Sequence, residues 1–208
     1  MEITGSTLDR KTNQAHQVVD DVARQAQTDA ATAYNALAGQ ACDVNLTGQD
    51  LGGLVLIPGA YCFSSSAQLT GTLTLDAQGN SNAVWVFQIG STLTTAVGAS
   101  VVFINNSPSC CHLFWQVGSS ATIGTNTAFA GNILALASIT LNTGATMSGK
   151  ALALNGAVTL DTNDPTAVRV QAFTATSSGN NLPLAGGTAA LTSFLALGWV
   201  WVQKKQNQ

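Results

Sequence analysis

The sequence predicts an all-β solenoid preceded by one long helix, and three observations support this fold class. Residues 9–39 have the composition and spacing of a helix. The short strand-like runs that follow are punctuated by Gly, Asn, Ser or Pro, and no second helical pattern separates them. Finally, three segments of similar sequence carry Thr122, Thr140 and Thr159, which are 18 and 19 residues apart. One coil of three short strands with its corners needs about this length.

The predicted helix follows a start, residues 1–8, that we expect to be disordered. Residues 9–38 contain no Gly or Pro, and small apolar side chains recur along one stripe: Val19, Val22, Ala23, Ala26, Ala30, Ala33, Tyr34 and Leu37. Glycine often follows the last helical turn, so Gly39 is expected to end the helix. Such a helix is marginal alone, and its narrow stripe suits packing along a flat neighbour.

Residues 40–172 are predicted to form the solenoid. Strand alternation turns one set of side chains inward as a stacked core: Ala121, Ile123, Ile139, Leu141, Val158 and Leu160. It turns Thr94, Thr122, Thr140 and Thr159 outward as a column with a spacing of about 4.8 Å. The segment 88–94 also matches 116–122 position by position. Threonine is a good strand residue on any solvated face, so this explanation stays open for each threonine taken singly.

Charge is scarce and unevenly placed. Only 8% of the residues are charged, against roughly 25% in typical soluble domains, and none lies between Ala77 and Gly149. A nucleic-acid partner would require clustered Lys and Arg, so it is excluded. The aspartates are scattered and no catalytic motif is present, so we expect neither an enzyme nor a cofactor. The composition indicates a flat, uncharged surface for an extended partner.

The four cysteines form two pairs. Cys42 and Cys62 bracket a stretch that reads as loop, strand, turn and strand, so a disulfide between them is sterically reasonable in an exported protein. Adjacent Cys110 and Cys111 cannot easily bond to each other without strain. Buried thiols are an equally good interpretation of this second pair. No Cys/His spacing suggests a metal site.

The C-terminal part is predicted to be a linker, residues 173–181, followed by an anchor, residues 182–208. Residues 182–202 carry no charge, and as a helix they would span the roughly 30 Å hydrocarbon layer of a membrane. Trp199 and Trp201 would fall near the interface, and Lys204 and Lys205 would stay inside. A buried core helix is the alternative.

Several long strings resemble the ice-binding-protein domain of polar bacteria, algae and fungi. The resemblance runs from about residue 20 to residue 162 and rests on residues 33–39, 46–54, 58–61, 83–91, 114–119 and 131–135. It implies a discontinuous, triangular, right-handed β-helix with one long helix alongside. It also implies adsorption to ice. The string Thr143-Gly144-Ala145-Thr146 resembles a short Thr-Ala/Gly-x-Thr/Asn element found near the ice-binding face of some members, whereas residues 95–98 depart from it at the last position.

We therefore expect ice to contact Thr94, Thr122, Thr140 and Thr159, with Thr143 and Thr146 at the edge of that face. The alternative is a cell-surface adhesin that binds carbohydrate or another surface without acting on ice. Aromatic platforms would favour the adhesin, but Trp85 and Trp115 lie among apolar neighbours and are expected in the core.

Two features of the chain ends add expectations. Family domains usually carry several strands before the long helix, and Met1 does not begin a signal peptide. Three alternatives stay open: a fragment, a misassigned start, or a β-helix that is incomplete at one end. The string Leu182-Pro183-Leu184-Ala185-Gly186, with the apolar run and Lys204-Lys205, is similar to a sortase sorting signal, although Ala185 stands where threonine is usual. We expect an extracellular protein held at the cell surface by a membrane or cell-wall anchor.

Overall fold

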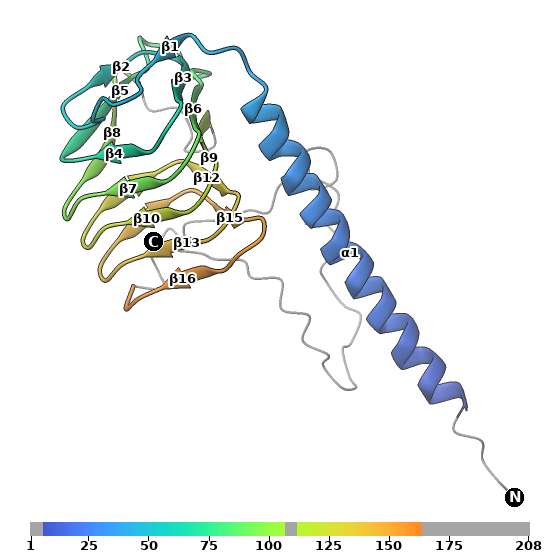
Figure 1. Ribbon diagram of the computed structural model, residues 1–208. Helices are drawn as coiled ribbons and strands as arrows, with labels where there is room; N and C mark the ends of the chain where they lie inside the picture. Colours follow the sequence, from blue (N-terminus) through green and yellow to red (C-terminus); the bar gives the residue numbers. More distant parts are fainter. Residues whose placement is uncertain (1–5, 107–111, 164–208) are drawn as a thin grey trace, which may run out of the picture.

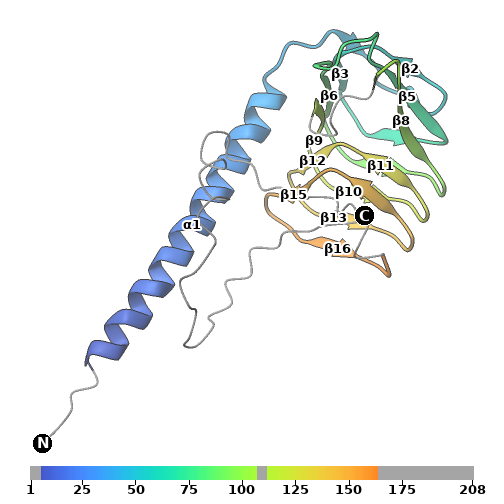
Figure 2. The same cartoon turned by 180° about the vertical axis from the view of Figure 1, so that it is seen from behind.

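The computed structural model describes residues 6–106 and 112–163. In this part of the chain three parallel sheets wind into a β-solenoid beside one helix, α1 (Ser6–Ala38) (Figures 1 and 2). The predicted linker, the anchor over residues 182–208 and the pair Cys110 and Cys111 lie outside the described residues. Within the described ranges, no helix is long and apolar enough to cross a membrane.

Each turn of the solenoid contributes one strand to each sheet. The helix-covered sheet contains β1 (Val44–Asn45), β3 (Gly59–Phe63), β6 (Trp85–Ile89), β9 (Leu113–Val117), β12 (Asn132–Ala135) and β15 (Ala151–Ala153). The threonine sheet contains β4 (Ala67–Leu69), β7 (Leu93–Thr95), β10 (Ala121–Ile123), β13 (Ile139–Leu141) and β16 (Val158–Leu160). The third sheet contains β2 (Val55–Leu56), β5 (Thr72–Asp76), β8 (Ser100–Ile104), β11 (Ala128–Ala130) and β14 (Thr146–Ser148).

The sequence repeat corresponds to successive coils. Thr122 pairs in register with Thr140, and Thr140 pairs with Thr159. The matching segments 88–94 and 116–122 are also neighbours, because Gln88 pairs with Gln116 and Thr94 with Thr122. Both observations confirm the solenoid and its three strands per coil.

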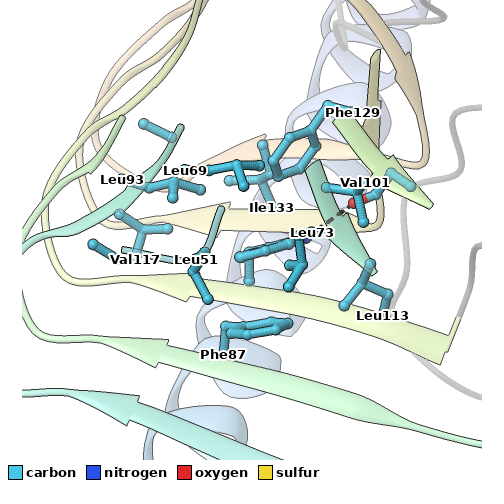
Figure 3. Packing of buried hydrophobic residues seen from close by; sticks show 14 of the residues in the cluster. Leu51, Leu69, Leu73, Phe87, Leu93, Val101, Leu113, Val117, Phe129 and Ile133 are labelled. Carbon is cyan, nitrogen blue, oxygen red and sulfur yellow. Dashed lines mark hydrogen bonds between the residues drawn. The ribbon is translucent and has the colours of Figure 1, made fainter. Parts of the chain in front are cut away.

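The core fills the space between the three sheets, and apolar side chains from all of them meet there (Figure 3). Ala121, Ile123, Ile139 and Leu141 are fully buried, as predicted. Leu160 is 40% exposed, so the prediction was wrong for this residue. It lies on β16, which pairs only with β13 among the described strands, and no further coil covers its inner side.

An aromatic stack runs along the core axis. The rings of Tyr61, Phe87 and Trp115 come from three neighbouring strands in register, with centroids 5.4 Å and 4.1 Å apart. Phe129 joins from the third sheet, 5.1 Å from Trp115, whose indole N–H donates to the carbonyl of Ala130 at 3.0 Å. Trp115 and Trp85 are both fully buried, which confirms their predicted place in the core.

Helix α1 begins three residues before the predicted start and packs on the helix-covered sheet. Ala33, Tyr34 and Leu37 form a second apolar cluster with sheet residues that include Val86 and Leu134. Val22 is 56% exposed, so the predicted stripe is only partly covered. Six strands at about 4.8 Å reach roughly 24 Å, which is the length of about 16 helical residues, so the N-terminal half of α1 projects past the last coil (Figure 1).

The C-terminal end of α1 is capped by a side chain from the sheet. The Nε2 amide of Gln88 donates to the carbonyl of Leu37 in the last helical turn at 2.7 Å and to the carbonyl of Gln40, just beyond the helix, at 2.9 Å. The Leu37 carbonyl also accepts the backbone N–H of Gln40 at 3.3 Å. Gly39 follows the helix as expected, but its φ is not in the left-handed range that glycine C-caps usually adopt. Gln88 supplies the cap from β6, 51 residues further along the chain than Leu37.

Replacing Gln88 by leucine is expected to lower the free energy of unfolding by about 1 kcal/mol, because the carbonyls of Leu37 and Gln40 both lose their side-chain donor. Chemical denaturation followed by circular dichroism measures this change. Gln49→Leu is the control, since Gln49 is exposed. Equal stability of the two variants would show that the cap contributes nothing.

A disulfide joins the residues after the helix to the first coils. Cys42 and Cys62 are bonded with their Cα atoms 5.9 Å apart, and this is the pair that the sequence predicts. Cys62 lies on β3 and pairs with Gln88, the residue that caps α1. The disulfide and the cap therefore hold the helix at the same end of the solenoid.

Candidate surface-binding face

Two of the three sheets have an outer face that the helix leaves open. Helix α1 covers the outer side chains of the helix-covered sheet, including Ala60, Val86 and Leu134. The threonine sheet and the third sheet lie on the other sides of the solenoid (Figures 1 and 2). A binding face for an extended partner must therefore be sought on one of these two.

The threonine sheet carries the predicted column of threonines. Thr94, Thr122, Thr140 and Thr159 occupy the same outward position on four adjacent strands. Thr94 and Thr159 are exposed, and Thr122 and Thr140 are partly exposed. Within the described part of the chain, none of the four hydroxyls has a hydrogen-bond partner in the protein. The column therefore presents regularly spaced donors and acceptors to whatever lies above the sheet.

A second row of hydroxyls runs beside the column. Ser66, Thr92, Ser120 and Ser138 lie two residues before the outward residue of their strands and stack in register. We call them the flanking hydroxyl row. This row was not predicted, although its regular offset from the threonines is visible in the sequence.

Most of the flanking row is bonded to neighbouring coils, unlike the threonine column. The hydroxyl of Thr92 donates to Ser66 at 2.8 Å, and the backbone N–H of Ser138 donates to the hydroxyl of Ser120 at 3.3 Å. The N–H of Ala157 similarly donates to the hydroxyl of Ser138 at 3.4 Å. These hydroxyls link adjacent coils rather than facing a partner.

Among the residues that the structure describes, charged groups lie only at the two ends of this face. Asp50 bridges to Gln68, which is the counterpart of Thr94 on β4, and so stands at one end of the column. Asp161 follows β16 at the other end and accepts a hydrogen bond from the hydroxyl of Thr143 at 2.9 Å. The five strands of the threonine sheet contain no charged residue.

Asp50 is held by the backbone. Its Oδ1 accepts the N–H of Gly52 at 2.6 Å and that of Thr70 at 3.0 Å. Burial acts to raise the pKa of Asp50, but the hydrogen bonds from Thr70 and Gly52 together outweigh it, so the pKa lies below its usual value. A lowered pKa in the folded state means that the ionised form stabilises the fold.

Asp50→Ala is expected to reduce stability at neutral pH by about 1–2 kcal/mol, because two N–H groups lose their acceptor. The stabilisation by the ionised form of Asp50 is present above the unfolded-state pKa of about 3.9 and is lost as the pH falls through the lower folded-state value. Denaturation curves at pH about 7 and about 2 test this, since the wild type and the variant should converge in acid. A Gln49→Ala control, at an exposed position without a titrating group, should match the wild type at both pH values.

Thr143 and Thr146 do not belong to the column. Thr143 lies in the corner after β13, and Thr146 is the first residue of β14 in the third sheet, where it pairs with Ala128. The corner between them turns at Gly144, whose φ of 71° is in the left-handed range. Gly98 and Asn126 occupy the same place in the two preceding coils, with φ values of 69° and 56°. Thr143 therefore lies at the edge of the threonine sheet, and Thr146 lies beyond the corner, on the third sheet.

The third sheet is a less regular surface. Its outward positions include Val55 and Val102, which are exposed, and the hydroxyls of Thr72 and Ser100 bond to each other at 2.8 Å. Within the described strands, no three neighbours of this sheet carry threonine at the same position. The threonine sheet therefore has the more uniform array of free hydroxyls.

The described surface offers little for other kinds of site. Trp85 and Trp115 are buried, so neither can serve as a platform for carbohydrate. Asp43 and Asp76, like Asp50, accept hydrogen bonds from backbone N–H groups. No group of three or more His, Cys, Asp or Glu side chains that could hold a metal ion occurs among the residues that the structure describes.

The fold and this face define a class of protein: a β-solenoid that presents in-register hydroxyls on a flat, charge-poor side. The chain belongs to the ice-binding-like family, whose sequence profile matches residues 2–166. This membership confirms the family that the sequence strings indicated.

Relatives and solved structures agree with this assignment. An ice-binding protein of Nostoc sp. (strain HG1) is 63% identical over 145 residues, which cover 69% of this chain and 53% of the relative. Ice-binding protein 1 of Shewanella frigidimarina is 38% identical and is covered over 16% of its length. The crystal structure of an ice-binding protein from an Antarctic biological consortium is 46% identical, with a TM-score of 0.65 over 68% of this chain and 64% of that one. The chain thus spans about half of the Nostoc relative.

Proposed function

We propose that this protein binds ice through the outer face of the threonine sheet, and so inhibits ice recrystallisation. The observation that carries the proposal is the column of Thr94, Thr122, Thr140 and Thr159, whose hydroxyls have no partner among the described residues. Membership of the ice-binding-like family and similarity to several proteins named ice-binding proteins support it.

The geometry suits a surface made of ordered water. Threonine hydroxyls repeat at the spacing of neighbouring strands, about 4.8 Å, and each can bond one or more water molecules. The threonine methyl groups between the hydroxyls form no hydrogen bonds with the adjoining water. Charged side chains would hold their own hydration shells, and in the described part of the chain they occur only at the ends of the face. Because the sheet is already rigid, little conformational entropy is lost on adsorption.

The full chain should keep ice crystals small in a recrystallisation assay, and a fluorescent conjugate should accumulate on a growing ice surface. An unrelated protein of similar size and charge serves as the control. Crystals that coarsen as fast as in buffer, with no labelled ice, would contradict the proposal.

We also propose that the protein acts outside the cell, held there by residues 182–208. The disulfide between Cys42 and Cys62 supports an oxidising compartment. The uncharged run followed by Lys204 and Lys205 supports a membrane or cell-wall anchor. Fractionation of cells that express the full chain tests this: detergent should release a membrane anchor, and a cell-wall hydrolase a covalently attached protein. Recovery of the full chain in the cytosol would contradict the proposal.

A further inference from the structure

The longest coil between two threonines of the column is the one that joins β7 to β10. The chain takes 28 residues from Thr94 to Thr122, but only 18 from Thr122 to Thr140 and 19 from Thr140 to Thr159. Thr94 and Thr122 nevertheless pair directly across this junction. The backbone ladder joins the two coils here, and side-chain hydrogen bonds are added to it.

A buried chain of hydrogen bonds crosses this junction. The hydroxyl of Thr127 donates to the carbonyl of Ala96 at 3.0 Å, and the N–H of Gly124 donates to the hydroxyl of Thr95 at 2.8 Å. The two hydroxyls lie 3.0 Å apart. Since the Thr127 proton is used on Ala96, Thr95 donates to Thr127, and the chain runs in one direction. Thr95 is 3% exposed and Thr127 0%.

These threonines are not needed to fill the core. The in-register counterparts of Thr95 are Ile123 and Leu141, and those of Thr127 are Ala99 and Ala145. Their hydroxyls instead lie where the two coils pass close to each other. A Cβ on Gly124 would collide with the carbonyl oxygens of Thr95 and Ala96.

The other junctions of the threonine sheet use the flanking hydroxyl row. Ser66 bonds Thr92 between β4 and β7, Ser120 bonds Ser138 between β10 and β13, and Ser138 bonds Ala157 between β13 and β16. In the described part of the chain, no hydrogen bond joins Thr92 to Ser120 between β7 and β10. The Thr95–Thr127 pair occupies the one junction that the row leaves without such a bond.

We infer that Thr95 and Thr127 are positioning residues for the ice-binding face: their buried hydroxyl pair keeps Thr94 and Thr122 at ladder spacing and in one plane. The inference rests on the proposed function. Thr95 directly follows Thr94, so a shift of the Thr95 backbone moves the outward hydroxyl with it. The pair is inaccessible and acts only through the threonines above it.

The test is the double variant T95V/T127A in the full chain. It should fold, because both replacements resemble the side chains that neighbouring coils hold at these positions. The Gly124 amide loses its acceptor, so its hydrogen exchange should become at least about tenfold faster. The concentration needed to inhibit recrystallisation should rise about tenfold, since each misplaced hydroxyl weakens contact with an ordered lattice. The variant T95S/T127S keeps both hydroxyls and should restore both readouts.

A control separates positioning from stability. Leu134→Ala empties a buried site under α1, far from the face, and should lower the melting temperature without changing recrystallisation inhibition. Loss of inhibition in T95V/T127A, with recovery in T95S/T127S, supports the inference. A folded T95V/T127A that inhibits like the wild type overturns it. If T95V/T127A does not fold, T127A alone replaces it in the same comparison.

Failure of the proposed function can be distinguished from failure of this inference. If the wild type does not inhibit recrystallisation, the nuclear Overhauser contact between the Thr94 and Thr122 methyl groups becomes the readout. Its loss in T95V/T127A still supports positioning, and its persistence overturns it.

Discussion

Replacing Thr140 by tyrosine is expected to abolish inhibition of ice recrystallisation in a protein that still folds. Thr140 lies on β13 between Thr122 and Thr159, in the interior of the column, and points outward. A tyrosine ring would stand above the sheet and keep the neighbouring hydroxyls from approaching a flat lattice together. Because all the threonines of the column contact the ice surface together, inhibition of recrystallisation should fall more than about tenfold. Recrystallisation inhibition and a melting curve, measured on the same sample, test this.

A matched variant on the other open side shows which face binds. Ala128 is exposed on β11 of the third sheet, and Ala128→Tyr introduces the same ring there. We expect Ala128→Tyr to keep its activity. If Ala128→Tyr is inactive and Thr140→Tyr is active, the third sheet is the ice-binding face and the assignment to the threonine sheet is wrong.

Trp115→Ala is expected to cost about 3–5 kcal/mol of folding stability, the usual range for truncating a buried aromatic side chain. Trp115 stacks on Phe87, contacts Phe129 and bonds the carbonyl of Ala130, so its loss opens a cavity and leaves that carbonyl without its donor. Since natural domains are stable by only about 5–15 kcal/mol, the variant should lose much of its cooperative unfolding transition. Calorimetry or denaturant titration measures the change.

Val97→Ala provides the comparison for Trp115→Ala. Val97 is 74% exposed in the corner after β7, and its truncation should change stability by less than about 0.5 kcal/mol. If both variants melt together with the wild type, the aromatic stack does not hold the solenoid.

The fold could be predicted because its period appears in the sequence as a repeat of 18 or 19 residues. A solenoid stacks each coil on its neighbour, so a residue that faces outward in one coil has counterparts one coil length away, as with Thr122, Thr140 and Thr159. Alternation then assigns the side chains between them to the core, as for Ile123 and Ile139. Prediction was weaker at the last coil, where no neighbour buries Leu160.

The candidate site could be predicted only in part. The threonine column follows from strand alternation, but alternation does not extend through a corner. Thr146 therefore lies on the third sheet, although it is only six residues from Thr140. The flanking hydroxyl row has a regular offset in the sequence, but which of its hydroxyls are bonded depends on which coils touch. The Thr95–Thr127 pair depends on contacts between coils alone.

The sequence by itself determined the kind of molecule this is: its period, its long helix, its disulfide pair and its column of outward threonines all arise from short-range pattern or spacing. Only the tertiary structure decided which sides of the solenoid remain open, where each corner turns and which hydroxyls are left free. The physical reason is that a hydroxyl is available to ice only if no neighbouring coil bonds it. That depends on contacts between residues 18 or more positions apart in the sequence.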